Sequence, residues 1–192
     1  MNTRIDLGDG AKWTNVFTGE THDGAQLALR DLLAVFPVAW LVSLFADKVA
    51  ICRDSNIALC PGGTLLEVAV AQGKVDAYVE WLQTLGVDHV EVSNGSLPMA
   101  PERKAELIAR LAAEFTVISE VGSKSGENAD APAWCDEMLR DLAAGAVLVI
   151  AEGRESGTVG LFDETGAVHK DLVEAILRAV GHETVIFEAP QR

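Results

Sequence analysis

From about residue 47 onward, short apolar runs alternate with stretches of helical periodicity, and this alternation constrains the fold more than any other feature. The apolar runs are rich in β-branched residues and lie at 57–60, 87–92, 115–118, 146–151 and 184–187. Residues 65–85, 102–114, 133–144 and 169–180 carry apolar side chains near helical spacing. Strands that alternate with helices predict parallel pairing through right-handed crossovers.

The predicted strands are continuously apolar, which is typical of a parallel sheet with both faces covered. Two folds satisfy this pattern: an open doubly wound sheet and a (β/α) barrel. The chain contains no G-x-G-x-x-G after its first strand and no P-loop, which disfavours a nucleotide-binding open sheet. We therefore predict an α/β fold of the (β/α) TIM-barrel type. A full barrel takes about 250 residues, so we expect this one to be incomplete or atypically closed, with 47–192 as its core and 1–46 as a divergent segment of the same domain.

Glutamates recur at or near the carboxyl end of four consecutive predicted strands. They are Glu91, Glu120, Glu152 and Glu188, at spacings of 29, 32 and 36 residues that suit one βα unit each. In a parallel barrel these strand ends open onto one face, and that face holds the active site. We therefore expect the four carboxylates to converge there, although strands also end in glutamate simply because they end in water.

Converging carboxylates need a compensating cation. Mg²⁺ prefers oxygen ligands and usually takes one or two carboxylates, so we expect one or two of the four glutamates to bind it. The remaining glutamates would hydrogen-bond to substrate or to Lys124 and Arg154, two basic residues in the same loops and candidates for anion capture or proton transfer. Glycines in these loops would let backbone amides approach an anion, or serve only as turn residues. They are Gly62, Gly63, Gly95, Gly153 and Gly157.

The overall charge narrows the possible partners. Fifteen basic against 29 acidic residues give a net charge of −14, which disfavours nucleic acid and anionic membrane as partners. The longest apolar stretch, 37–46, has about half of the ~20 residues that a membrane span needs. The polar start does not resemble a signal peptide, and the three cysteines form no C-x-x-C motif, so we expect a cytoplasmic protein.

Five segments, in matching order and spacing, resemble those of the phosphosulfolactate synthase family. They are PGGTLLE at 61–67, VEVSNGS at 90–96, SEVGSK at 119–124, VIAEGRESG at 149–157 and FEAPQ at 187–191. The resemblance runs from about Asp47 to the last residue. It implies a (β/α)-barrel enzyme of coenzyme M and sulfolactate biosynthesis that adds sulfite to phosphoenolpyruvate with Mg²⁺, giving (2R)-phospho-3-sulfolactate, and that forms homo-oligomers.

The resemblance also implies roles for individual residues. Lys124 would protonate the carbon beside the new bond, with Glu120 as a further catalytic residue, and Arg154 would hold phosphate or sulfonate. Glu91, Glu152 and Glu188 would supply the metal ligands. The substrate would lie against loop residues of the matching motifs, namely Gly62, Gly63, Thr64, Ser93, Ser123, Glu155 and Gly157.

The chain also departs from the family pattern. The stretch 37–45 has no lysine where the family carries one, Asn94 replaces an aspartate, and the strand that follows EAPQ in the family has no counterpart here. Three hypotheses follow from these observations. The chain is a sulfite-adding synthase, another Mg²⁺-dependent barrel enzyme acting on a small phosphorylated or carboxylic acid, or a degenerate barrel that serves as a subunit or binding module.

Overall fold

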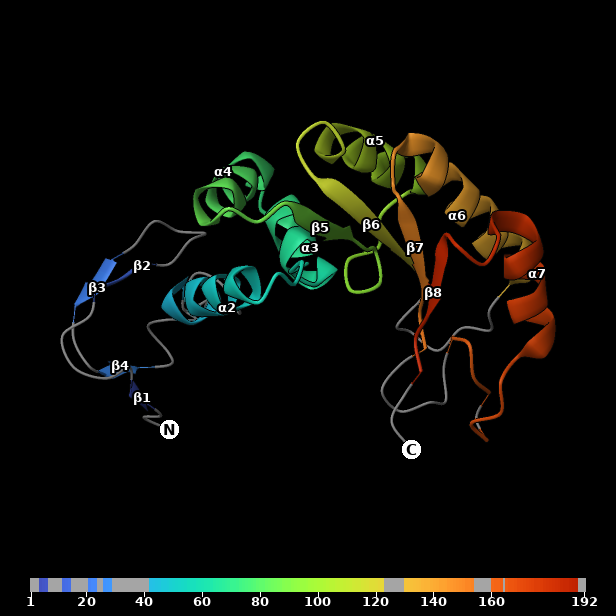
Figure 1. Ribbon diagram of the computed structural model, residues 1–192, viewed down its shortest axis with the longest axis horizontal. Coiled ribbons are helices and arrows are strands. Elements are labelled where there is room, and N and C mark those ends of the chain that lie inside the picture. The colour runs from blue at the N-terminus through green and yellow to red at the C-terminus, as the bar shows by residue number, and fades with distance from the viewer. Residues whose placement is uncertain are drawn as a thin grey trace. The chain divides into compact units, whose positions relative to one another are not determined.

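The computed structural model describes four short strands at 4–6, 12–14, 21–23 and 26–28, then residues 42–122, 130–153, 160–163 and 165–189 (Figure 1). The chain folds as two compact units. Residues 1–59 and 74–87 form the first, and residues 60–73 and 88–192 form the second, which carries the predicted glutamates.

Among its described residues, the first unit has two antiparallel strand pairs and two helices. Strand β1 (Arg4–Asp6) pairs with β4 (Gln26–Ala28), and β2 (Lys12–Thr14) pairs with β3 (Thr21–Asp23). The helices are α2 (Val42–Asp54) and α4 (Val75–Leu85). The rings of Phe45 in α2 and Trp81 in α4 lie 5.1 Å apart, so an aromatic contact joins these helices. The sequence predicted none of these strands and did not predict α2.

Two predictions near the junction of the units are wrong. The strand predicted at 57–60 is irregular chain, and Ile57 within it is 60% exposed. The single helix predicted over 65–85 is two helices, α3 (Gly63–Ala71) and α4. Gly73, with a φ of 65°, lies in the left-handed region between them, where a helix cannot continue.

The second unit is built on a four-stranded parallel sheet in the order β5-β6-β7-β8. The strands are β5 (His89–Val92), β6 (Thr116–Val121), β7 (Leu148–Ala151) and β8 (Val185–Phe187). The crossover helices are α5 (Pro101–Leu111), α6 (Ala131–Ala144) and α7 (Lys170–Val180). These elements confirm the four later strands and three later helices of the sequence prediction, and with them the α/β class.

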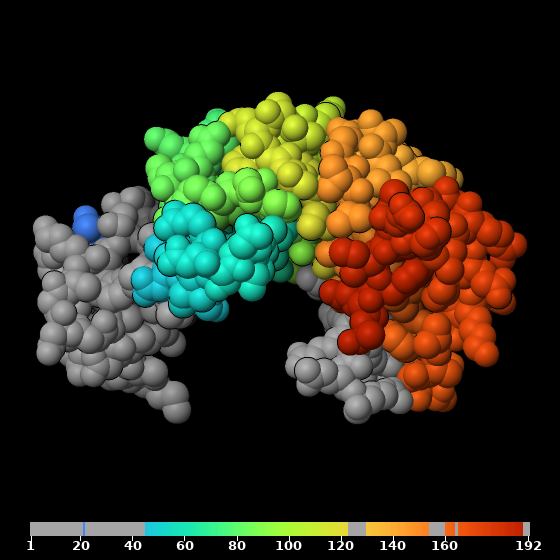
Figure 2. All heavy atoms as spheres, viewed as in Figure 1, coloured from blue at the N-terminus to red at the C-terminus, as the bar shows by residue number. Residues whose placement is uncertain are grey.

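Helices α5, α6 and α7 cover one face of this sheet (Figure 1). Alternate side chains of β5, β6 and β7 are buried on that face: Val90, Val92, Val117, Val121, Val149 and Ala151. Trp134 and Met138 of α6 and Leu172 and Ile176 of α7 pack into one core with Val121, Val149 and Ala151 of these strands. In the space-filling view, the orange and red residues of the second unit form one continuous mass of atoms (Figure 2). The outer layer of βα units is therefore well packed.

The opposite face of the sheet is less covered. Ile118 and Ile150 there are half-buried, and Ile186 is 43% exposed. Because strand side chains alternate between faces, this second face is the one that would line the inside of a barrel. Within the described segments, no helix is both long and apolar enough to cross a bilayer.

Candidate functional site

The strand register places the four predicted glutamates on one face of the sheet. Glu91 pairs with Ile118 across β5 and β6, and Glu120 pairs with Ile150 across β6 and β7. Glu152 and Glu188 directly follow Ala151 and Phe187, which are paired with each other. Their backbone amides continue the ladder, donating to the carbonyls of Val121 at 3.0 Å and Ala151 at 3.2 Å.

Registered neighbours in a sheet point to the same side, and side chains two residues apart along a strand do so as well. Along this register Glu91 and Glu120 lie on the face opposite the helices, near the carboxyl end of the sheet. Glu152 and Glu188 come one residue after the last registered pair, and continued alternation would place them on the same face. The geometry therefore brings the four strand ends to one edge, but no three of the four carboxylates, all of them among the described residues, come together there, so the expected convergence is not seen. The metal and catalytic roles of these glutamates stay predictions.

The first of these carboxylates is tied to the loop before α3. Oε1 of Glu91 accepts a hydrogen bond of 2.6 Å from the backbone amide of Gly63. A Cβ on Gly63 would lie 2.8 Å from Cβ of Ser93 and 2.9 Å from Oε1 of Glu91, which is closer than real Cβ atoms approach. Gly63 and Ser93 are buried, whereas Gly62 and Thr64 are exposed at the start of the helix. The structure thus brings Gly63, a predicted substrate-binding residue, against Glu91 and next to Ser93.

The last carboxylate makes a similar contact. Oε2 of Glu188 accepts a hydrogen bond of 3.0 Å from the backbone amide of Gly153. Glu152, only 4% exposed, lies beside this amide, and its carbonyl accepts a hydrogen bond of 3.1 Å from Leu161. The ends of β7 and β8 are therefore linked through one side chain. Glu188, like Glu91, thus accepts a hydrogen bond from the backbone amide of a glycine.

Five predicted site residues lie outside the described residues: Ser123, Lys124, Arg154, Glu155 and Gly157. Within the part of the chain that is described, no three His, Cys, Asp or Glu side chains come together as a metal-ligand group. Mg²⁺ needs only one or two protein carboxylates, because water and substrate supply the rest of its octahedron. The donor set at this edge, carboxylate oxygens on one face, fits that requirement.

A buried carboxylate that sequence reasoning missed organises the loop after β5. Glu67 of α3 is 2% exposed and accepts a hydrogen bond from the Ser93 hydroxyl. It also accepts bonds from the backbone amides of Ser96, at 2.9 Å, and Leu97. Because three donors converge on it, Glu67 holds the loop that carries Ser93 and Asn94 beside the end of β5.

A buried charge cluster lies on the helix side of the same strand ends, and sequence reasoning missed it as well. Lys104 of α5 is fully buried, and its Nζ lies 2.7 Å from Oε1 of Glu137 and 2.8 Å from Oδ2 of Asp141, both on α6. The same ammonium donates to the backbone carbonyl of Glu120 at 2.7 Å. The Ser119 hydroxyl donates to Asp141.

The sequence did contain a sign of this cluster. Lys104 stands in the same helical stripe as Leu107, Ile108 and Leu111, and Asp141 in the stripe of Trp134 and Met138. Opposite charges at core positions of successive helices predict a buried pair, since neither could be buried alone. Burial raises the pKa of the Asp141 carboxyl, and the neighbouring Lys104 ammonium opposes that rise.

The cysteines supply no reactive thiol at this edge. Cys60 is half-buried just before the PGGT segment, and burial together with the charge of Glu91 raises the pKa of its thiol to about 12. A thiol with that pKa is almost wholly protonated at neutral pH, so Cys60 is not suited to act as a nucleophile.

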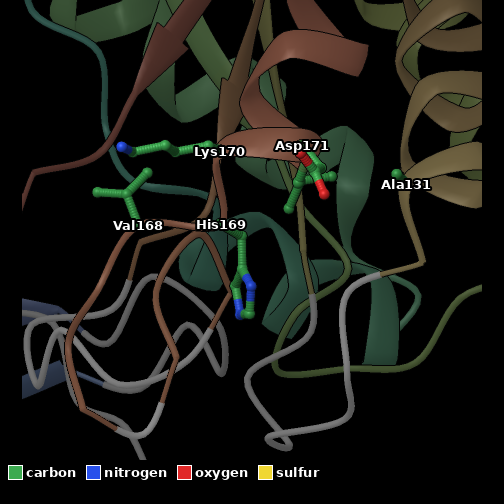
Figure 3. Close-up of a pocket in the computed structure, with 6 residues that line it drawn as sticks. Ala131, Val168, His169, Lys170 and Asp171 are labelled. Carbon is green, nitrogen blue, oxygen red and sulfur yellow. The ribbon is translucent and has the colours of Figure 1, made fainter.

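A surface hollow of about 410 Å³ lies beside the start of α7 and is lined by Ala131 and residues 168–172. The side chains of His169, Lys170 and Asp171 leave the chain there in different directions (Figure 3). Because its polar groups do not converge and its lining includes none of the predicted site residues, the hollow is not the site that the glutamates define.

The parallel βα units and the acidic carboxyl edge define an α/β protein of the (β/α) TIM-barrel type. A crystal structure from Burkholderia cenocepacia J2315, provisionally described as that of a lyase/mutase, is similar with a TM-score of 0.57 over 82% of this chain and 56% of that one. The two sequences are 16% identical, so this likeness concerns the fold alone.

The chain belongs to the (2R)-phospho-3-sulfolactate synthase (ComA) family, whose model matches residues 23–192. It is 36% identical to the phosphosulfolactate synthase of Bacillus subtilis (strain 168) over 170 residues, which are 84% of this chain and 68% of that protein. It is 38% identical to the phosphosulfolactate synthase of Methanocaldococcus jannaschii over 152 residues, 76% of this chain and 60% of that protein. The chain thus spans about two thirds of these relatives' lengths. The family model matches from residue 23, well before Asp47, the residue near which the resemblance was expected to begin.

Proposed function

We propose that this chain catalyses the Mg²⁺-dependent addition of sulfite to phosphoenolpyruvate, giving (2R)-phospho-3-sulfolactate. The observation that supports the proposal is the common face of Glu91, Glu120, Glu152 and Glu188 at the carboxyl edge of the sheet, in a chain of this family. Parallel barrels carry out their chemistry at that edge.

The reaction sets definite demands on the residues there. A sulfur lone pair forms the new bond to the methylene carbon, and the π electrons of the double bond move toward the carboxylate. A proton then goes to the carbon that carries the phosphate group. Lys124, in the SEVGSK motif, donates this proton, and Glu120 of the same motif orients it. Arg154, in the VIAEGRESG motif, binds the phosphate or the sulfonate.

The net charge of −14 makes the electrostatics of substrate capture the main difficulty. Both substrates are anions, and four glutamates at the edge of the sheet repel them. One or two of Glu91, Glu152 and Glu188 would hold Mg²⁺, which when bound supplies positive charge to the substrate carboxylate. The basic side chains predicted in the loops supply the rest.

The proposal is tested by incubating the purified protein with phosphoenolpyruvate, sulfite and Mg²⁺ and detecting phosphosulfolactate by mass spectrometry. Product should form and should disappear when Mg²⁺ is chelated. In Lys124→Ala, product formation should be lost while the far-UV circular dichroism stays unchanged. Lys48→Ala, a change at an exposed lysine in the first unit, is the matched control and should retain activity.

The same measurements separate this proposal from its alternatives. Mg²⁺ binding without product would favour another barrel enzyme acting on a small phosphorylated or carboxylic acid. Neither product nor Mg²⁺ binding would favour a non-catalytic subunit or binding module. We further propose that the chain works as a homo-oligomer in the cytoplasm, which analytical ultracentrifugation and localisation of a tagged protein would check.

A further inference from the structure

The buried ammonium group of Lys104 connects the helix layer to the strand ends that carry the proposed site. It contacts Glu137 and Asp141 on α6 and the backbone carbonyl of Glu120 at the carboxyl end of β6. Oε1 of Glu137 in turn accepts a hydrogen bond of 3.2 Å from Nδ2 of Asn94, in the loop after β5. One cation therefore bridges two helices and the ends of two neighbouring strands.

This arrangement is unusual for a purely structural contact. Lysine is almost never fully buried, because desolvating its charge is costly unless partners compensate. An apolar side chain at position 104 would continue the stripe of Leu107, Ile108 and Leu111 without that cost. The buried charge therefore calls for an explanation beyond packing, and its contact with the Glu120 carbonyl supplies one.

Ser119 and Glu120 are consecutive residues in a strand, so their side chains point to opposite faces. The Ser119 hydroxyl is held by Asp141 on the helix side, and the Glu120 carbonyl is held by Lys104 on the same side. With the backbone anchored at both points, the direction in which the Glu120 side chain leaves the strand is set toward the other face. That face carries Glu91, Glu152 and Glu188.

We infer that Lys104 is a positioning residue, which fixes the end of β6 through Asp141 and the Glu120 carbonyl and so aims the Glu120 carboxylate into the acidic edge. The inference rests on the proposed function for its catalytic consequence. Misplacing a reacting group by about 1 Å can cost about 100-fold in rate. Loss of Lys104 should therefore lower kcat by about that factor, while KM for both substrates changes little.

The decisive variant is Lys104→Met combined with Asp141→Asn, which removes both charges together. The single change Lys104→Met leaves the fully buried Asp141 carboxylate unpaired, whereas after the double change only Glu137, whose side chain is 19% exposed, loses its cation. The asparagine can still accept the Ser119 hydrogen bond. Lys104→Arg keeps the cation, and Arg103→Met, at the neighbouring exposed position of α5, is the control. For each variant, the thermal midpoint, kcat and both KM values are measured.

We expect the double variant to melt close to the wild-type protein and to lose about 100-fold in kcat, with KM within about threefold. Lys104→Arg should recover most of the lost kcat, and Arg103→Met should be indistinguishable from wild type. A folded double variant with wild-type kcat would overturn the inference. If the double variant does not fold, Ser119→Ala removes the second anchor alone, and it should lower kcat by about tenfold; unchanged kcat in Ser119→Ala would also overturn the inference.

A second measurement does not depend on catalysis. The carboxyl ¹³C resonance of Glu120, assigned by its loss in Glu120→Gln, should shift in the double variant and in Ser119→Ala but not in Arg103→Met. If the wild-type protein makes no phosphosulfolactate, the proposed function fails and this resonance alone decides the positioning role. An unmoved resonance in folded variants would refute it.

Discussion

Adding one methyl group at Gly63 should disturb the site more than adding one at its neighbour Gly62. A Cβ on Gly63 would lie 2.8 Å from Cβ of Ser93 and 2.9 Å from Oε1 of Glu91. Ser93 cannot retreat freely, because its hydroxyl donates to the buried Glu67. Glu91 cannot retreat either without losing the hydrogen bond that it accepts from the Gly63 amide.

The size of the effect follows from these contacts. Overpacking of this kind costs about 1–3 kcal/mol, and the strained hydrogen bond contributes about 1 kcal/mol more. Replacing glycine with alanine also lowers the backbone entropy of the unfolded chain, which stabilises the folded state by about 0.4–1 kcal/mol. The net loss for Gly63→Ala is therefore about 2 kcal/mol, a fall in Tm of about 4–8 °C for a chain of this length.

The matched control is Gly62→Ala. A Cβ at Gly62 meets nothing within 4 Å, and its φ of −63° suits alanine, so its Tm should stay within about 2 °C of wild type. Thermal unfolding followed by far-UV circular dichroism compares the two variants directly. The reasoning is refuted if Gly63→Ala is as stable as wild type, or if both variants lose the same stability.

Other predictions concern single side chains. The pKa of the Cys60 thiol is about 12, against an ordinary value of 9.0, so its thiolate fraction at pH 8 should be about 1,000-fold lower than that of an ordinary cysteine. Peptide mass spectrometry after iodoacetamide treatment should therefore find Cys60 unmodified, and rapid labelling would contradict the prediction. Hydrogen bonds from Thr165 and Ala167 lower the pKa of Asp163 below its ordinary value of 3.8. The turn that Asp163 stabilises should therefore persist above pH 3.8 and open as the pH falls through the lowered pKa, which would speed amide exchange at Ala167. If the exchange rate at Ala167 follows only the intrinsic pH dependence of a free amide, the prediction is wrong. Glu67→Ala should destabilise the fold by about 3 kcal/mol because three donors lose their acceptor, whereas Glu67→Gln should lose about half as much in urea unfolding; equal losses would argue against a hydrogen-bonding role.

Local patterns were enough to predict the second unit. The β-branched runs around Val90, Val117 and Val149 became strands, and the stripe of Leu107, Ile108 and Leu111 became the buried side of α5. Such patterns are properties of consecutive residues, so they can be read without knowing what the segment packs against. The same reasoning failed at 57–60, where an apolar run has no sheet partner, and at Gly73, whose left-handed backbone ends a helix that looked continuous.

The sequence also predicted where the strands end, and the spacing of the glutamates put one at or near each strand end: Glu91, Glu120, Glu152 and Glu188. Whether they share a face depends on the register between strands, which the hydrogen-bonded pairs of the sheet decide. A slip of one residue in the outer pairs would have turned one carboxylate toward the helices, and a slip between β6 and β7 would have turned two.

The sequence by itself therefore determined the βα rhythm, the acidic strand ends and the family to which the chain belongs. Tertiary structure alone decided that Glu67 holds the loop after β5 and that Lys104 lies between α5, α6 and the end of β6. The physical reason is that a charged side chain is buried only where partners from other elements compensate its lost hydration. Those partners, Glu137 and Asp141, are 33 and 37 residues away along the chain.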